Sequence, residues 1–265
     1  MKHCKIPLFT RIFSFFLCIL LLGGCSSTVT RKPTVTTTGE DIPAGGGSVY
    51  TKRVALTYDD GPHVTRTKKI VDELAKYGYH ATFFILGNRV DGTAYNGAEA
   101  MVYAANAGNE IAIHGYGHTV MKDVATMKSE MHAASAVIRK YLPGYQVRLM
   151  RPPEGRMDAG VVSACPYSAI LWSVDSEDWR HSYSSAENTP DAAERVNTIV
   201  SNVMRDLEDG DIILMHDIHE STYDATVVLL ERLHAEGYEV VTVSELMGTL
   251  ISPGNKYFGR PAALG

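Results

Sequence analysis

Apolar, β-branched runs alternate with helical patterns along most of this chain, and few folds accommodate that order. The runs fall at 53–58, 80–86, 110–114, 147–151, 169–174, 211–216 and 238–243. A helical pattern such as 67–77 keeps its apolar side chains on one face and ends at Gly78, as helices often do. Strands that alternate with helices form a parallel sheet that the helices bury. The order therefore predicts an α/β fold with about seven parallel strands.

Titratable side chains stand where these runs end. They are Asp59, Asp60, His114, Arg151, Asp175 and His216. In α/β sheets and barrels the chemistry takes place at the carboxyl ends of the strands. Unrelated surface residues would scatter over both ends, so the pattern predicts a functional site at one end of the sheet.

Asp59 and Asp60 are adjacent carboxylates that Gly61 and Pro62 follow at once. Side chains alternate along a strand and fan out at a turn, so both acids can face one centre. Such a pair can divide the work between a metal ligand and a general base. The alternative is a solvated strand end, because Asp and Gly are common in turns.

His114 and His118 are two imidazoles four positions apart, and they begin where the 110–114 run ends. With Asp60 as an oxygen ligand they suit Zn²⁺ or a similar divalent cation, with positions left for water as in a catalytic site. The Glu of an H-E-x-x-H protease motif is absent, which disfavours that class. The alternative is a pair of surface histidines in a loop.

Five short motifs lie in register along the chain, at 57–62, 114–118, 151–153, 175–179 and 214–216. In order and rough spacing they resemble the motifs of polysaccharide deacetylases, carbohydrate esterase family 4. The resemblance covers most of residues 50–250. It implies a distorted (β/α) barrel with a single catalytic domain.

The resemblance also implies that Asp60, His114 and His118 bind one divalent metal ion, with Zn²⁺ favoured and Co²⁺, Ni²⁺ or Mn²⁺ as alternatives. Asp59 would be the general base that takes a proton from water. His216 would be the acid that protonates the departing sugar nitrogen. Physical chemistry supports this division, because a metal acidifies water and an imidazolium is a suitable acid near neutral pH.

Four further residues receive roles from the same resemblance. Arg151 would hold Asp59 through a charged hydrogen bond, and Asp178 would orient the catalytic imidazole and keep it protonated. Trp179 and Leu214 would line a pocket for the acetyl methyl group. The alternatives are a structural ion pair for Arg151, a core position for Trp179 and an ordinary strand position for Leu214.

Two positions depart from the family's pattern. Glu154 stands where the third motif usually has Tyr. It is expected to change the wall of the substrate cleft and to disfavour an acidic substrate nearby, whereas the oxyanion donor at this position is a backbone N–H that any such residue supplies. Gly115 replaces the usual Ser or Thr and removes a hydroxyl that can steady the loop.

Residues 1–24 have the pattern of a signal peptide, with a positive start and an apolar run too short to span a bilayer. Their end resembles the bacterial lipobox, which implies cleavage before Cys25 and lipid attachment to its sulfur. An uncleaved signal anchor is the alternative. Residues 25–48, rich in Ser, Thr, Gly and Pro, are typical of a flexible tether.

One domain is expected at 49–250, followed by a tail at 251–265. The net charge of −5 and the lack of a Lys/Arg cluster argue against nucleic acid as a partner. Cys165 is the one cysteine that remains for this domain, so we expect no internal disulfide.

Together these features predict a metal-dependent hydrolase that removes N-acetyl groups from a β-1,4-linked amino sugar polymer. Peptidoglycan N-acetylglucosamine is favoured, because an exported lipoprotein anchored to the membrane faces the cell wall. One alternative is another acetylated glycan, such as chitin oligomers, an exopolysaccharide or acetylxylan. A lipoprotein that binds glycan without catalysis is the other, and it would need neither Asp59 nor His216.

Overall fold

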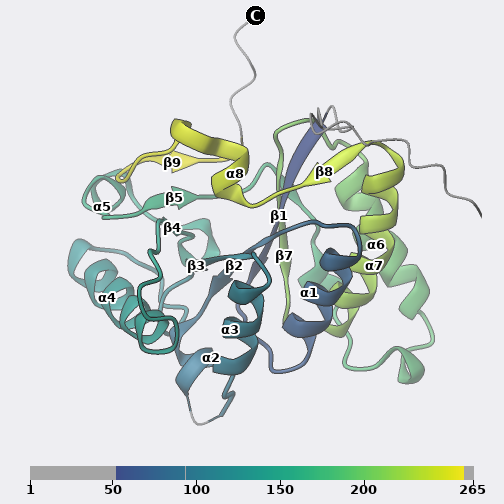
Figure 1. The fold of residues 1–265 in the computed structure, drawn as a ribbon, viewed down its shortest axis with the longest axis horizontal. Helices are drawn as coiled ribbons and strands as arrows, with labels where there is room; N and C mark the ends of the chain where they lie inside the picture. The colour runs from purple at the N-terminus through teal and green to yellow at the C-terminus, as the bar shows by residue number, and fades with distance from the viewer. Residues whose placement is uncertain (1–51, 93, 260–265) are drawn as a thin grey trace, which may run out of the picture. The chain divides into compact units, whose positions relative to one another are not determined.

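The computed structural model describes residues 52–92 and 94–259, whose arrangement Figure 1 shows. The predicted signal peptide, Cys25 and the predicted tether lie outside the described residues. Among the described residues no helix is both long and apolar enough to cross a membrane. The described residues belong to one compact unit, Gly46–Gly265.

A curled sheet of parallel strands forms the centre of this unit. Its strands are β1 (Lys52–Asp59), β2 (Thr82–Ile85), β3 (Glu110–Ile113), β4 (Leu149–Met150), β5 (Ser168–Ile170), β6 (Val174–Asp175), β7 (Ile212–His216), β8 (Tyr238–Val240) and β9 (Lys256–Tyr257). They lie in the order β6-β7-β1-β2-β3-β4-β5-β9, and β8 pairs with the first residues of β1. The pairings between these strands are parallel. The predicted α/β fold, a distorted barrel of parallel strands, is confirmed.

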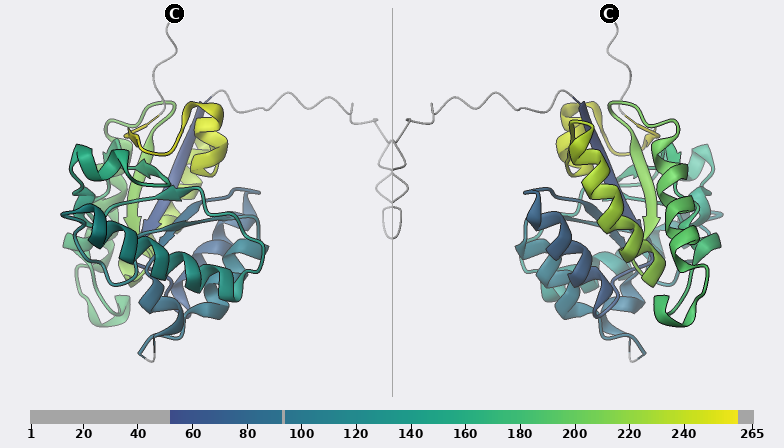
Figure 2. Two further views of the ribbon diagram at one scale, coloured as in Figure 1. Left: turned by 90° about the vertical axis from the view of Figure 1, so that its left-hand side faces the viewer. Right: turned by 90° about the vertical axis from the view of Figure 1, so that its right-hand side faces the viewer.

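Helices cover the outer face of the sheet. They are α1 (Arg66–Lys76), α2 (Gly87–Asp91), α3 (Ala98–Asn106), α4 (Val124–Tyr141), α5 (Ala159–Ser163), α6 (Ala192–Met204), α7 (Glu220–Ala235) and α8 (Val243–Met247). The right-hand view of Figure 2 shows α7 beside α1 and α6. Leu74 of α1 and Leu229 of α7 belong to the main core together with Leu56 of β1. Burial of these apolar faces holds the helices on the sheet.

The side chains of β1 alternate between two cores. Leu56 and Tyr58 belong to the main core under the helices, whereas Ala55 belongs to a smaller cluster inside the curl of the sheet. Leu246 of α8 is part of the inner cluster and closes one end of the curl. Since successive strand residues face opposite sides, Asp59 shares the inner face with Ala55 and lies at the other end. The alternation of side chains along β1 therefore places the Asp59 carboxylate on the inner face of the sheet, at the carboxyl end of the strand.

The predicted strand at 169–174 forms two short strands at different places in the sheet. β5 pairs with β4 and β9, whereas β6 pairs with β7. Arg151 supplies a physical reason, because its guanidinium binds the carbonyls of Ile170 and Leu171 at 3.0 and 2.9 Å and withdraws them from a continuous ladder. β9 lies beyond the predicted domain boundary at residue 250 and extends the sheet at β5.

Candidate active site

The carboxyl ends of β1, β3 and β7 meet at the open end of the curl. Asp59 and His216 are direct partners in the register of β1 and β7. One cleft at this end is lined by Asp59, Asp60, His114, His118, Glu154, Gly155, Trp172, Asp175, Trp179, Leu214, His216 and His219. Arg151 and Asp178 are buried, each in contact with one of the cleft residues. The structure therefore brings together all the residues to which the sequence assigns a role in catalysis, metal binding or substrate binding.

Asp60, His114 and His118 each offer one ligand atom, and these atoms lie within 4.8 Å of one another. Oδ1 of Asp60 is 3.5 Å from Nε2 of His114 and 3.5 Å from Nε2 of His118. Nδ1 of His114 is 2.9 Å from the carbonyl oxygen of Arg151. That carbonyl can only accept, so Nδ1 carries the proton and Nε2 presents a lone pair. Burial lowers the pKa of His114 to about 3, which keeps the ring neutral.

These three residues fit a divalent cation. Ligands held at about 2.0–2.1 Å around a tetrahedral centre are about 3.4 Å apart, close to the distances between Asp60 and the two imidazoles. Oδ1 of Asp60 is also buried without a hydrogen-bond partner, a costly state unless a cation compensates it. Asp60 and His118 have φ angles of 67° and 60°. Strained backbone of this kind in non-glycine residues is concentrated at functional sites.

The loop that carries His118 is held by a carboxylate from α4. Oε2 of Glu130 accepts hydrogen bonds from the backbone N–H groups of Tyr116 and Gly117 at 2.7 and 2.9 Å. Gly115 has a φ of +103°, which side-chain-bearing residues rarely adopt, and a Cβ there would lie 3.1 Å from Glu130. The sequence predicted that Gly115 removes a hydroxyl that steadies this loop. In the structure the carboxylate of Glu130 steadies the loop instead.

Arg151 fixes Asp59 at the base of the cleft. Its Nη1 donates to Oδ1 of Asp59 at 2.8 Å and to Oγ1 of Thr57 at 2.8 Å. The other carboxylate oxygen of Asp59, Oδ2, is not the one that Arg151 binds, and it lies 3.8 Å from Nε2 of His114. Burial raises the pKa of Asp59, and the charge of Arg151 opposes this rise. Arg151 thus holds one oxygen of this buried carboxylate, and the other oxygen faces the candidate metal ligand His114.

His216 and Asp178 form a second buried pair on the other side of the cleft. Nδ1 of His216 lies 2.7 Å from Oδ1 of Asp178. The other carboxylate oxygen of Asp178, Oδ2, accepts hydrogen bonds from the backbone N–H of His216 at 2.7 Å and from the hydroxyl of Thr222 at 2.6 Å. Burial disfavours the imidazolium, but the Asp178 carboxylate outweighs it and raises the pKa of His216 to about 9. The ring is therefore protonated near neutral pH, and its Nε2–H is available to the cleft.

Comparison with known proteins places this site in a family. A family model described as polysaccharide deacetylase matches residues 46–168. A peptidoglycan-N-acetylglucosamine deacetylase of Bacillus cereus is 31% identical over 74% of this chain and 88% of its own length. The chain belongs to the polysaccharide deacetylase family. The predicted resemblance is confirmed.

Other members of the deacetylase family extend the comparison. The peptidoglycan-N-acetylmuramic acid deacetylase PdaC of Bacillus subtilis is 34% identical over 74% of this chain, which spans only 38% of the length of PdaC. A solved structure of PdaC matches with a TM-score of 0.63 and 35% identity over 74% of this chain and 89% of the solved one. A family 4 acetyl xylan esterase from Clostridium thermocellum, in complex with a cobalt ion, matches with a TM-score of 0.68 and 28% identity over 80% and 100% of the two chains.

Two residues set the rim of the cleft in this deacetylase family member. Trp179 is 50% exposed, so the alternative of a core position is wrong. Glu154 has a φ of 57° and lies 3.1 Å from Arg156, in an exposed ion pair. Leu214 is 5% exposed and lines the same cleft from β7. The departure from the family's pattern at Glu154 therefore places a carboxylate at the rim of the cleft. This carboxylate forms an ion pair with the guanidinium of Arg156.

Three residues that sequence reasoning leaves without a functional role belong to the site. Trp172 and Gly155 line the cleft, and Thr222 donates to Asp178. An indole near the end of a predicted strand run is a signal that can identify Trp172. Thr222 has no comparable signal, because its partner is 44 positions away in the sequence.

Proposed function

We propose that this protein is a metal-dependent hydrolase that removes N-acetyl groups from a β-1,4-linked amino sugar polymer, with N-acetylglucosamine in peptidoglycan as its substrate. The observation that carries the proposal is the pairing of charges around Asp60, His114 and His118. A base held by Arg151 lies on one side, and an acid held by Asp178 lies on the other. Amide hydrolysis needs both a proton acceptor and a proton donor.

The residues of the cleft divide the reaction between them. Bound at Asp60, His114 and His118, a divalent ion supplies Lewis acidity toward the acetyl carbonyl and toward water. Oδ1 of Asp59 is engaged by Arg151, so Oδ2 accepts the proton of the attacking water. The Nε2–H of His216 then protonates the nitrogen of the sugar as the amide bond breaks.

Further groups bind the acetyl group and the developing charge. The backbone N–H of Glu154 is proposed to stabilise the oxyanion, because the left-handed turn at Glu154 lies on the wall of the cleft. Trp179 and Leu214 both line the cleft, and they are proposed to contact the acetyl methyl group. The exposed indole of Trp179 also offers a flat apolar surface to a sugar ring.

The names of the relatives support a cell-wall glycan as the substrate. Curated relatives are named as deacetylases of peptidoglycan N-acetylglucosamine and N-acetylmuramic acid, and a chitooligosaccharide deacetylase of Bradyrhizobium is 29% identical over 91% of its length. A second candidate function is ester hydrolysis on acetylated xylan, which the likeness to the acetyl xylan esterase favours. A binder without activity is disfavoured because both the base and the acid are present with their partners.

Acetate release tests the proposal on the compact unit that begins at Gly46. Peptidoglycan, chitin oligomers and acetylxylan are compared at equal acetyl content. We expect about one divalent ion per chain and the highest kcat/KM on an amino sugar polymer. Release from acetylxylan alone would establish the esterase, and metal binding without acetate from any acetylated glycan would establish the binder.

The division of labour between the two acids has its own test. Asp59→Asn is expected to retain the metal ion and to lose about 10²–10⁴ in kcat, as removal of a general base does. Asp60→Asn is the matched variant, because it changes the neighbouring carboxylate to the same amide and is expected to lose the metal ion. Metal content and acetate release are measured on both variants. Loss of the ion in Asp59→Asn would contradict the separate roles.

We also propose that the protein is exported and anchored to the membrane by lipid on Cys25, so that the domain faces the cell wall. The pattern of residues 1–24 and the composition of residues 25–48 support this location. The relatives that act on peptidoglycan are consistent with it.

A further inference from the structure

A second hollow adjoins the catalytic cleft on the side of Gly155. Its lining is Val120, Met121, Lys122, Gly155, Arg156, Met157, Asp158 and Lys256. We call it the basic hollow, after Lys122, Arg156 and Lys256. Gly155 lines both spaces, so a polymer that extends from the cleft on this side passes over the basic hollow.

Loops that also carry site residues build the basic hollow. The loop after β3 holds His118 and continues to Met121, which forms a parallel bridge with Met157. Both methionine side chains are buried. Lys256 of β9 reaches the same place and donates from Nζ to the carbonyl of Met157. The fold therefore fixes the hollow before any ligand arrives, which lowers the entropy cost of binding.

Charge distinguishes the basic hollow from the chain as a whole. Three cationic side chains and one carboxylate line it, although the net charge of the chain is −5. Lys122 and Arg156 are exposed. Arg156 lies 3.1 Å from the carboxylate of Glu154 and offsets the charge that was expected to disfavour acidic substrates. The basic hollow thus attracts anions at this flank of the cleft.

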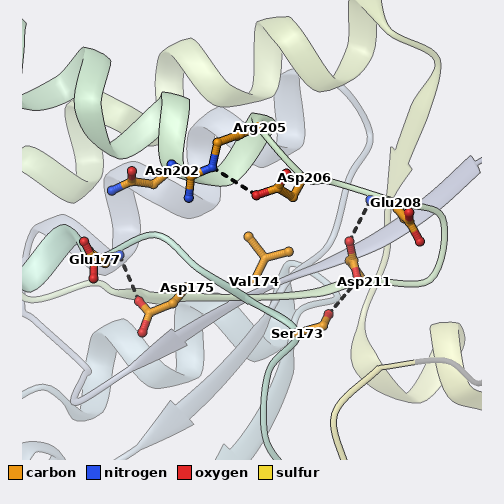
Figure 3. A pocket seen from close by; sticks show the side chains of 9 residues that line it. All are labelled: Ser173, Val174, Asp175, Glu177, Asn202, Arg205, Asp206, Glu208 and Asp211. Carbon is orange, nitrogen blue, oxygen red and sulfur yellow. Dashed lines mark hydrogen bonds and ion pairs between the residues drawn. The ribbon is translucent and has the colours of Figure 1, made fainter.

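A third hollow beside the cleft has the reverse charge. Asp175 lines both the catalytic cleft and this third hollow, whose other titratable residues are Glu177, Arg205, Asp206, Glu208 and Asp211. Figure 3 shows this third hollow, where Arg205 lies 3.0 Å from Asp206. Five carboxylates share one guanidinium there, so the third hollow repels anions. Of the two hollows that adjoin the cleft, the basic hollow is therefore the one suited to an anion.

We propose that the basic hollow binds a carboxylate of the glycan, on a sugar near the one that loses its acetyl group. The inference rests on the proposed function and narrows its substrate class to acidic acetylated glycans. A carboxylate accepts charge-assisted hydrogen bonds from Lys and Arg, and a guanidinium can bind it through two N–H groups. In peptidoglycan the carboxylate comes from the lactyl ether of muramic acid or from the stem peptide. Chitin oligomers have no such group.

Acetate release by the full chain in detergent tests the inference with three substrates. They are chitin oligomers, peptidoglycan strands freed of peptide by an amidase, and strands with intact peptide. Lys122→Gln/Arg156→Gln is expected to lower the kcat/KM for peptide-free strands about tenfold relative to that for chitin oligomers, because two charge-assisted contacts are lost. A fall confined to the intact strands would support the same hollow with the peptide as the source of the carboxylate.

A matched double variant removes the same charge elsewhere. Lys128→Gln/Arg139→Gln lies on α4, where both residues line a different hollow, and it is expected to leave the substrate ratio unchanged. An equal fall in this control would indicate general attraction and overturn the subsite. The inference would also be overturned if Lys122→Gln/Arg156→Gln left the kcat/KM of both peptidoglycan substrates unchanged relative to that of chitin oligomers while acetate release continued. Absence of acetate from all three substrates with the unaltered chain would instead contradict the proposed function.

Discussion

At the scale of single residues, the proton on His216 depends on Asp178. Burial opposes the charged imidazole, and the neighbouring carboxylate raises the pKa of His216 to about 9 in spite of it. The imidazole acts as an acid only while it is protonated, so kcat/KM is expected to fall above a pH of about 9. The raised pKa also stabilises the fold below a pH of about 6.5, and this contribution is lost as the pH rises through about 9.

Asp178→Asn removes the carboxylate that does most to offset burial, and only the smaller effects of Asp59 and Asp60 still raise the pKa of His216. We expect the pKa of His216 to fall below its ordinary value of 6.5, and the alkaline limb of the pH–rate profile to move down with it. At pH 7.5 the rate then drops at least about tenfold, because less than about a tenth of the imidazole keeps its proton. Thr222→Val removes only a neutral donor to Asp178 and should shift the limb less. An alkaline limb that stays in place in Asp178→Asn would contradict the role of the pair.

Residues that carry the chemistry were predictable where their surroundings are local. His114 and His118 are close in the sequence and follow an apolar run, so their approach could be inferred from spacing. Asp217 is different, because it is fully buried although no motif in the sequence includes it. A Cβ on Gly61 would lie 2.2 Å from its Oδ1. That contact joins the ends of β1 and β7, and no local pattern indicates it.

At the scale of elements, Arg151 joins three parts of the sheet. It lies directly after β4, binds Asp59 and Thr57 of β1, and binds carbonyls at the end of β5. The side chain is completely buried, with its guanidinium 4.2 Å from the ring centre of Phe84. The sequence suggested either a holder of Asp59 or a structural ion pair. The contacts of Arg151 combine both roles, because the same guanidinium binds Asp59 of β1 and the carbonyl of Ile170 in β5.

Arg151→Met is expected to lower the free energy of unfolding by about 3–5 kcal/mol, the cost of leaving a buried charge without its partner. Urea unfolding in the presence of a chelator measures it, so that metal binding does not contribute. Arg148→Met is the control on the same segment, and because Arg148 is exposed we expect a change within about 0.5 kcal/mol. The double variant Arg151→Met/Asp59→Asn should be more stable than Arg151→Met, because it also removes the charge that was left unpaired. It should not be more active. Equal midpoints for the Arg151 and Arg148 variants would contradict this account.

The elements that sequence reasoning located best are those with a strong local period. The helix predicted at 67–77 and the strand at 53–58 are found as α1 and β1, displaced by about a residue at their ends. The run at 169–174 reads as one strand because every residue but Ser173 is apolar. At the end of β5, before β6 begins, the carbonyls of Ile170 and Leu171 bind the guanidinium of Arg151, which lies 19 and 20 positions earlier in the sequence. β9 consists of only two residues, too few to show a period.

At the scale of the whole molecule, net charge conceals the distribution that matters for the substrate. The value of −5 argues against nucleic acid as a partner, but it averages over two hollows of opposite charge that adjoin one cleft. Lys122, Arg156 and Lys256 come from three distant segments that the barrel brings together. A sequence scan for cationic clusters therefore misses them. The charge that borders the cleft is visible only in the folded chain.

The proposed anchor makes a prediction for the entire chain, because it decides which polymers the cleft can reach. Wild-type protein should sediment with membranes, and Cys25→Ala should be released or retained as an unprocessed precursor of larger size. Cell fractionation with immunoblotting measures both. Stable anchoring needs more than one acyl chain, so the loss of the lipid-bearing sulfur should be sufficient for release once the leader is cleaved.

Cys165→Ala is the control, because this buried thiol lies within the domain and should not change fractionation. Wild-type distribution and size for Cys25→Ala would contradict lipid attachment, while acetate release by the same variant from soluble glycans should be unaffected.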